Sequence, residues 1–166
     1  SAPTDLPSLS PQTAAPVSQT PTNLALTGLA SANTECLNQW ARKAIDGIAT
    51  GGNRYEGCNT PGSFIMVDLG KDTLNHIDTV IIKNRCDCCG GRLKLFHVEV
   101  LDADKNVVWS QYHGGTVGNC VVKTFQVNGG EGAVGRWVRL RYDDSYTSIL
   151  HIAELEAWGY RFSVPS

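Results

Sequence analysis

Short runs in which apolar and polar residues alternate fill most of the chain beyond residue 60. Alternation with a period of two places the apolar side chains on one face of a strand and is typical of half-buried β-strands. Clusters of Gly, Asn and Asp separate the runs, as turns between strands require. The predicted strands are Ser63–Leu69, Ile77–Lys83, Leu93–Leu101, Val107–Gln111, Val121–Val127, Arg136–Tyr142 and Ile152–Tyr160.

One segment has a helical pattern instead. Leu37–Ile45 (LNQWARKAI) is followed by Asp46 and Gly47, which favour a helix end. Many short strands with Gly-rich turns predict an all-β antiparallel sandwich or barrel. On such a scaffold we expect the binding residues in long loops.

The composition changes near residue 22. Residues 1–22 are mostly Ser, Thr, Pro and Ala, contain five of the chain's seven prolines, and lack Lys and Arg. Such a segment buries too little apolar surface to offset its ordering entropy, so we expect a linker. It is either a stalk that tethers the domain to a larger extracellular protein or a plain N-terminal tail. One domain should follow at 23–162, with a short tail at 163–166.

The net charge and the cysteine content limit the possible classes of partner and the cellular location of the protein. The net charge is −2 with both signs mixed along the chain, which argues against a partner such as nucleic acid or an anionic membrane. No apolar run approaches the roughly 20 residues that a membrane-spanning helix needs. Six cysteines, three of them clustered outside common zinc spacings, indicate a secreted or cell-surface protein. No catalytic motif stands out, so we do not expect an enzyme.

The segment NRCDCCGGR holds the most distinctive polar chemistry. Arg85 and Arg92 each carry five N–H donors in a planar fork and no acceptor. Two such forks suit a ligand rich in oxygen acceptors: a sugar, a carboxylate or a phosphate. Asp87 lies between them, and we expect it to pair with the guanidinium groups and hold their orientation.

Two adjacent cysteines, Cys88 and Cys89, lie in the same segment. A disulfide between neighbours would form a rigid apolar plate beside the arginines, and a sugar ring could rest its C–H face on it. Two alternatives stay open. Each cysteine could pair with a distant one, or both could join Cys86 and a histidine around zinc.

The RCDCCGGR segment resembles the R-x-D-x4-R/K motif of the F-type lectins, or fucolectins. These belong to the wider discoidin and coagulation-factor C-type, galactose-binding-like group. The resemblance covers most of residues 23–162. It implies a jelly-roll β-sandwich with long ligand-binding loops at one end and a terminal fucose-like sugar as the ligand. Further similar segments are NLALTGLA, KAIDG, VDLG, TFQV, GRWVRL and AELEAWG.

The resemblance also implies roles for individual residues. The motif arginines would hydrogen-bond the sugar, and the Cys88–Cys89 disulfide would lie against its ring. The family places a histidine shortly before the motif, but the segment RYEGCNTP contains none. Asn59 or Thr60 stands in its place as a short polar contact. Tyr55 and Glu56 are further candidates for contacting the ligand.

A structural calcium ion is a second feature that the resemblance implies. Calcium takes six to eight oxygen ligands, mixing carboxylates and backbone carbonyls. Without the resemblance, Asp46 would be a turn residue and Glu154 a polar strand residue. The implied ligands are the side chains of Asp46 and Glu154 and the backbone oxygens of Lys43, Ile48, Gly57 and Ala153.

The six cysteines of the chain allow fifteen different sets of disulfide pairs. In the family, the cysteine that matches Cys58 pairs with one at the position of Ala153, which is not a cysteine here. Cys36 is then the preferred partner of Cys58. That leaves Cys86 for Cys120, a bond that would join two binding loops.

We therefore expect an extracellular carbohydrate-binding domain whose partners are glycans or glycoproteins. It would belong to a larger multidomain or oligomeric extracellular protein and would not insert into a membrane. The alternative is a structural or adhesive protein-interaction module whose sugar pocket is altered, because the family histidine is absent.

Overall fold

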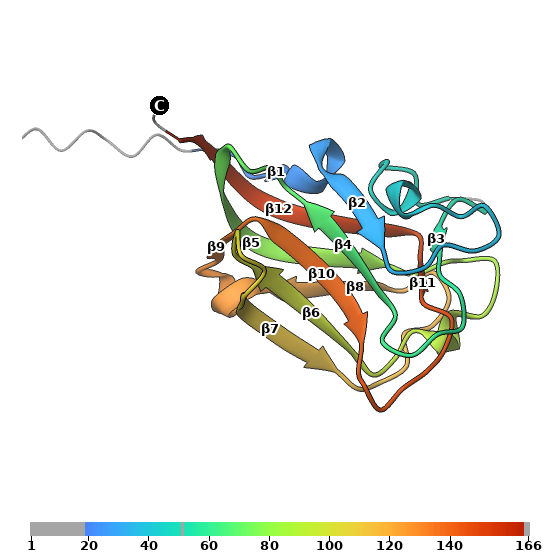
Figure 1. Ribbon diagram of the computed structural model, residues 1–166. Coiled ribbons are helices and arrows are strands. Elements are labelled where there is room, and N and C mark those ends of the chain that lie inside the picture. Colours follow the sequence, from blue (N-terminus) through green and yellow to red (C-terminus); the bar gives the residue numbers. More distant parts are fainter. Residues whose placement is uncertain (1–18, 51, 165–166) are drawn as a thin grey trace, which may run out of the picture.

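A computed structural model describes residues 19–50 and 52–164 (Figure 1). Two antiparallel sheets pack face to face, as the all-β prediction required. The first has the order β1-β12-β5-β8, with β9 also paired to β5. Its strands are β1 (Thr22–Asn23), β5 (Thr73–Lys83), β8 (Val122–Gln126), β9 (Ala133–Gly135) and β12 (Glu154–Ser163).

The second sheet has the order β2-β4-β10-β6-β7. Its central strand β10 pairs with β4 on one side and β6 on the other, so that Val138 lies opposite Val67 and Val100. Its strands are β2 (Leu29–Ala32), β4 (Phe64–Asp68), β6 (Phe96–Leu101), β7 (Val107–His113) and β10 (Trp137–Tyr142).

The core lies between the two sheets and follows the period-two pattern of the sequence. Alternate residues of β10 are buried, and the residues between them are partly exposed. Each fully buried aliphatic side chain contributes roughly 1.5–3 kcal/mol to the stability of the fold. Large, fully buried side chains include Ile65, Ile77, Ile82, Phe96, Leu101, Leu140, Tyr142 and Leu155.

A third, two-stranded sheet marks the functional end. It consists of β3 (Tyr55–Glu56) and β11 (His151–Ile152). Figure 1 shows it at the end of the sandwich away from the C terminus, next to the 3₁₀ turn η2 (Ala41–Ala44). The other 3₁₀ turns are η1 (Leu24–Thr27), η3 (Gly90–Arg92) and η4 (Val127–Gly130).

The predicted helix Leu37–Ile45 is wrong. Only Ala41–Ala44 forms a single 3₁₀ turn. Leu37 and Asn38 have φ angles of 57° and 56°, which a right-handed helix cannot contain. The loop is instead attached to β3, because Cys36 N donates to Glu56 O and Glu56 N donates to Gln39 O. Tertiary contacts therefore override the local pattern.

The predicted strands all exist, with shifted ends. β5 begins at Thr73, four residues earlier than expected, and β6 begins only at Phe96, after Leu95 with its positive φ angle of 52°. The predicted strand Ile152–Tyr160 divides into β11 and β12. The short strands β1, β2, β3 and β9 were not predicted. Most of the expected linker at 1–22, and the end of the expected tail, lie outside the described residues.

No helix among residues 19–50 and 52–164 is long and apolar enough to cross a membrane.

Candidate functional site

Arg85 lies just beyond the end of β5 and is held on two sides. Its Nε and Nη2 donate to the two carboxylate oxygens of Asp87, at 2.8 and 2.7 Å. Its Nη1 donates to Oε2 of Glu56 at 3.1 Å. The Arg85 side chain is only 5% exposed. A bidentate pair of this kind fixes the plane of the guanidinium group and holds the pKa of Asp87 well below its usual range.

Glu56 is a buried anchor for two arginines. It also accepts from Arg54 Nε at 2.6 Å, so one carboxylate holds two arginines. Tyr55 is fully buried, and its hydroxyl donates to Thr34 O at 2.8 Å. Both side chains are buried in this structure, and a contact of Tyr55 or Glu56 with the ligand stays a prediction. Sequence analysis missed Arg54.

Arg92 differs from Arg85. Its backbone carbonyl accepts from the hydroxyls of Tyr142 and Tyr146, at 2.7 and 3.0 Å, so its main chain is fixed. Its guanidinium group makes no hydrogen bond or ion pair within residues 19–50 and 52–164. The expectation that Asp87 orients both arginines holds only for Arg85. The five N–H donors of Arg92 therefore have no protein partner in the described part of the chain.

Two asparagines that sequence analysis missed shape the motif loop. Nδ2 of the buried Asn84 lies within 3.0 Å of the carbonyl oxygens of Gly90, Val117 and Gly118. Gly90 N donates to Oδ1 of Asn119 at 2.6 Å. The contacts of Asn84 with Val117 and Gly118, and that of Gly90 with Asn119, join residues 29 to 34 positions apart in the chain, so no local sequence signal could have predicted them.

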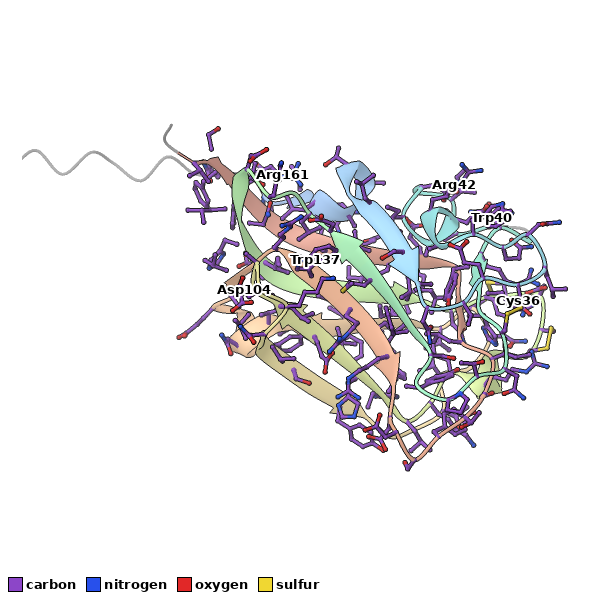
Figure 2. All side chains as sticks on the ribbon, in the orientation of Figure 1. Cys36, Trp40, Arg42, Asp104, Trp137 and Arg161 are labelled. Atoms are coloured by element: carbon purple, nitrogen blue, oxygen red, sulfur yellow. A yellow bond between two sulfur atoms is a disulfide. The ribbon has the colours of Figure 1, made fainter. Side chains whose placement is uncertain are left out.

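The three expected disulfide pairings are present in the structure: Cys36–Cys58, Cys86–Cys120 and Cys88–Cys89. No cysteine of the described chain is free, so the zinc alternative and the distant-partner alternative do not describe this structure. Cys88 and Cys89 are half-buried, with their Cα atoms 3.8 Å apart, and Cys89 has a φ angle of 62°. Figure 2 shows Cys36 and nearby disulfide sulfur atoms at the same end as Trp40 and Arg42.

Asn59 and Thr60 lie in the loop after β3, beyond Gly57 and Cys58. Asn59 is exposed and Thr60 is half-buried, and Thr60 forms an isolated β-bridge with Ser148. Their loop thus lies beside the segment that leads into β11. Neither side chain hydrogen-bonds to Arg85 or Arg92 within the described part of the chain.

His151 is a residue whose importance sequence analysis did not recognise. It is fully buried and lies directly across the small sheet from Glu56. Neither ring nitrogen makes a hydrogen bond of good geometry among the described residues, although the backbone of Cys89 lies close enough to oppose the fall of the ring's pKa. Burial, together with the positive charges of Arg85 and Arg92, lowers the pKa of His151 to about 4, so the ring is neutral at pH 7.

Four oxygen atoms converge in the loop that the calcium expectation singled out. Nδ2 of Asn53 lies 3.3 Å from Lys43 O and 2.8 Å from Ile48 O. It also lies 3.1 and 3.0 Å from the two carboxylate oxygens of Asp46. An amide nitrogen has only two hydrogens, so it cannot satisfy four acceptors. Such an oxygen set suits a hard divalent cation.

Glu154 adjoins the same loop. Its Oε1 accepts from Gly47 N at 2.9 Å, while its buried Oε2 has no partner within the described residues. Burial raises the pKa of Glu154 to about 7. No cluster of three or more His, Cys, Asp or Glu side chains suited to a metal occurs in the described chain, so a cation here would depend on backbone oxygens. These donors are carboxylate and carbonyl oxygens, the atom types that calcium binds.

The other two expected calcium ligands lie in backbone that pairs with neighbouring strands. Gly57 N donates to Leu150 O, and Ala153 N donates to Lys83 O, both at 2.8 Å. The structure thus brings Lys43, Asp46 and Ile48 together around Asn53. Asn53 itself was not predicted.

This β-sandwich, with paired arginines and a disulfide plate at one end, defines a carbohydrate-binding module of the lectin type. The model of the family described as NedA-like, galactose-binding domain matches residues 43–140, more than half of the 166-residue chain. The chain belongs to this family. No curated protein matches it by sequence.

Several solved structures share the fold. A Streptococcus pneumoniae fucose binding module, SpX-3, is 25% identical with a TM-score of 0.74, over 84% of this chain and 98% of that one. An f-lectin (fucolectin) from striped bass (Morone saxatilis) serum is 23% identical with a TM-score of 0.73, over 86% of this chain and 50% of that one. The chain thus spans half of the fucolectin's length.

A third similar structure is the family 32 CBM from C. perfringens NanJ, solved in complex with galactose. It is 18% identical with a TM-score of 0.67, over 83% of this chain and 98% of that one. At this identity the similarity is one of fold. The expected jelly-roll architecture and the carbohydrate-binding class are therefore confirmed, whereas the individual sugar is not decided by these relatives.

Proposed function

We propose that the domain binds a terminal fucose or a closely related deoxyhexose at the pocket formed by Arg85, Arg92 and the Cys88–Cys89 disulfide. The main support is that the guanidinium group of Arg92 has no partner within the described chain, although two tyrosine hydroxyls fix the backbone of this residue. A positioned, unpaired set of N–H donors beside an apolar plate suits a ligand with one polar and one apolar face.

A deoxyhexose has these two faces. Its hydroxyls and ring oxygen would accept from Arg92 and from the N–H groups of Arg85 that Asp87 and Glu56 leave unused. Its C–H groups and methyl would lie against the sulfur atoms of Cys88 and Cys89. Asn59 and Thr60 would supply polar contacts from the adjacent loop. The 25% identity with a fucose binding module supports the choice of sugar.

We also propose that calcium stabilises the loops that support this pocket. Asp46 and Glu154 would bind the ion through their side chains, and Lys43, Ile48, Gly57 and Ala153 through their carbonyl oxygens. When bound, the ion would neutralise the carboxylates and hold the loops together. The oxygens that converge on Asn53, and the unpaired oxygen of Glu154, support this assignment.

The three disulfides support an oxidising location. We propose that the domain acts outside the cell or at its surface, as part of a larger assembly, and recognises glycans or glycoproteins there without chemical turnover. A purely adhesive role in binding protein is the second candidate, favoured by the absence of the family histidine near Thr60.

Titration of the wild-type protein, Arg92→Ala and Arg92→Lys against fucosylated and galactosylated glycans tests the proposal. A hydrogen bond from a charged group contributes about 1.5–3 kcal/mol, so Arg92→Ala should lose about ten- to a hundredfold in affinity. Arg92→Lys should also lose affinity, because the planar fork is gone. The melting temperature should change little, since no group of the described chain bonds to this guanidinium.

Arg161→Ala provides a matched control, because that guanidinium lies beside Leu69 and Thr27, in the body of the sandwich. It should reduce stability and leave sugar affinity intact. If the Arg92 variants bind as tightly as the wild type, the pocket is elsewhere. If no glycan binds the wild-type protein, the adhesive role is favoured.

A further inference from the structure

A hollow in the surface lies where the loop between β2 and η2 packs beside β2. It has a volume of about 460 Å³ and is lined by Ala30, Glu35, Trp40 and Arg42. None of these residues belongs to the pocket proposed for fucose or to the proposed calcium ligands. Small-molecule sites typically measure roughly 300–1,000 Å³, so the hollow is large enough for a sugar unit.

The turn η2 holds Trp40 at the surface. Ala41 and Ala44 are buried and attach the turn to the core, and the carbonyl of Trp40 accepts from Lys43 N at 3.0 Å. Trp40 itself is 42% exposed. Figure 2 shows Trp40 and Arg42 beside this turn. The indole therefore offers a large, flat, apolar surface to a ligand from a fixed backbone position.

Two charged side chains supply hydrogen bonding in the same hollow. Glu35 Oε1 accepts from Ala41 N at 2.9 Å, which fixes the carboxylate at the start of η2. Its Oε2 accepts no hydrogen bond from residues 19–50 and 52–164. The guanidinium group of the exposed Arg42 makes no hydrogen bond or ion pair within the same ranges. Since a carboxylate only accepts and a guanidinium only donates, the hollow offers both kinds of hydrogen bond.

The loop that carries Glu35 and Trp40 is fixed before any ligand binds. A disulfide joins Cys36 to Cys58. Cys36 N also donates to Glu56 O at 2.8 Å, and Glu56 N donates to Gln39 O at 3.1 Å. A loop that is already held in place loses little conformational entropy on binding, so these contacts favour a ligand site.

The chemistry of the hollow matches that of a β-linked glucose or galactose unit. The ring of such a sugar has C–H groups on its face, which can lie against an indole, and hydroxyls at its rim, which both donate and accept. Glu35 would accept from one hydroxyl, and Arg42 would donate to another. A stable contact with a protein needs roughly 800 Å² from each partner, far more than the four residues of this hollow provide.

We propose that Glu35, Trp40 and Arg42 form a second carbohydrate-binding site, separate from the fucose pocket, that takes a β-linked glucose or galactose unit. The inference does not depend on the pocket proposed for fucose. Two sites on one domain would allow it to hold a glycan-covered surface at two points, which raises the overall affinity without any new contact at either site.

The test starts from Arg92→Ala, which weakens the fucose pocket, and titrates it with lactose and cellobiose by protein-observed NMR. Arg92→Ala should bind at least one of the two disaccharides. Adding Arg42→Ala should lower this affinity about ten- to a hundredfold, the loss expected for a hydrogen bond from a charged group. Adding Trp40→Ala should abolish measurable binding, because the surface beneath the ring is lost, whereas Trp40→Phe should keep part of it.

Leu37→Ala is the matched control, because Leu37 is 73% exposed in the same loop and does not line the hollow. It should bind like the Arg92→Ala background. If Leu37→Ala loses as much affinity as Trp40→Ala, the ligand contacts a broad apolar face and the inference is overturned. If Trp40→Ala does not fold, an unchanged affinity of Arg42→Ala overturns it.

Failure of this inference is distinguishable from failure of the proposed function. If Arg92→Ala binds neither disaccharide, the second site is overturned. The affinity of the wild type for methyl fucoside, and its loss in Arg92→Ala, then decide the fucose pocket separately.

Discussion

At the residue scale, the two arginines of one motif have different environments. Arg85 is almost completely buried and fixed by Asp87 and Glu56, so its main effect is to give the motif loop a definite shape. Arg92 has a fixed backbone and an unpaired side chain. Within the described chain, the motif therefore contains one arginine that shapes the loop and one whose guanidinium has no protein partner, a division that the sequence spacing does not reveal.

The Asp87–Arg85 pair predicts a pH-dependent contribution to stability. Hydrogen bonds from Arg85 hold the pKa of Asp87 in the folded state well below its ordinary value of 3.8. A lowered folded-state pKa contributes stability above the unfolded value and loses it as the pH falls through the folded value. Asp87→Asn should therefore melt at a lower temperature than the wild type at about pH 5–8, and this difference should shrink steadily below about pH 4.

Thermal melts of both proteins between neutral and acid pH measure this difference. Asp104→Asn, in the exposed turn between β6 and β7, is a suitable control, because its carboxylate forms no ion pair within the described chain. A constant difference between wild type and Asp87→Asn down to the lowest pH would contradict the assigned role of the charge.

At the element scale, loops rather than strands form the site. Residues 84–92 join 117–121 through Asn84, Asn119 and the Cys86–Cys120 bond. The loop before β3 is held by Cys36–Cys58. These connections restrict the loops before any ligand binds, which reduces the entropy that binding must overcome.

Two of these loops pack closely against each other at Gly90. A Cβ atom at this position would overlap the side chain and backbone of Asn119. Gly90→Ala should therefore destabilise the protein by about 1–3 kcal/mol and weaken sugar binding, because the motif loop must shift. At Gly91, the nearest atom to an added Cβ is Thr116 Cγ2, at an ordinary 3.7 Å.

Denaturant unfolding and sugar titration of Gly90→Ala and Gly91→Ala provide the comparison. Gly91→Ala should resemble the wild type in both assays. Equal behaviour of the two variants would mean that the packing against Asn119 does not constrain the motif loop.

The proposed calcium site lies in another loop, the one that contains Asp46. If only the folded state binds calcium, a free calcium concentration about a hundred times the dissociation constant raises the free energy of unfolding by about 2.7 kcal/mol. For a domain of this size, removing it should lower the melting temperature by about 5–10 °C. Asp46→Ala should already melt lower and should respond little to EDTA.

Calorimetric melts with and without EDTA, followed by calcium titration, measure the effect. Asp78→Ala serves as the control, because its carboxylate pairs with His76 on β5, away from this loop. If EDTA changes the melting temperature of the wild type and of Asp46→Ala by the same amount, the proposal that this loop binds calcium is contradicted.

At the scale of the whole molecule, the residues that stabilise the fold and the residues of the candidate site lie in different parts of the sandwich. The core lies between the sheets, whereas the site lies at the end of the molecule away from the C terminus (Figure 1). The first described strand, β1, pairs with β12 near that terminus, at Trp158 and Gly159. The chain ends of the described domain are therefore distant from the ligand loops, an arrangement compatible with attachment to other domains.

This arrangement predicts the effect of truncation. Removal of residues 1–18 leaves β1 intact, so sugar affinity and melting temperature should be unchanged. Removal of residues 1–23 deletes β1 and the Asn23 side chain, which accepts from Ala25 N and Ala157 N. That variant should melt at a lower temperature. Loss of sugar binding in the shorter truncation would mean that the N-terminal segment contributes to recognition.

The sequence by itself determined the fold class and much of the candidate site. Alternation with a period of two is a local property, so it predicted the long strands and their buried faces. The motif arginines, Asp87 and the adjacent cysteines were also readable, because their chemistry is concentrated in nine consecutive residues. The similarity of this segment to the F-type lectins then implied the sandwich type and the disulfide pairing.

Only the tertiary structure decided which of these groups are available to a ligand. The assignment of Leu37–Ile45 as a helix failed because contacts with β3 impose positive φ angles on Leu37 and Asn38. Glu56 and His151 are about 95 residues apart and meet only through the pairing of β3 with β11. Asn53 lies among the carbonyl oxygens of its own loop because that loop closes around it. The pairing of β3 with β11 is a long-range contact, and the closing of the Asn53 loop depends on its three-dimensional shape, so no periodic sequence pattern specifies either.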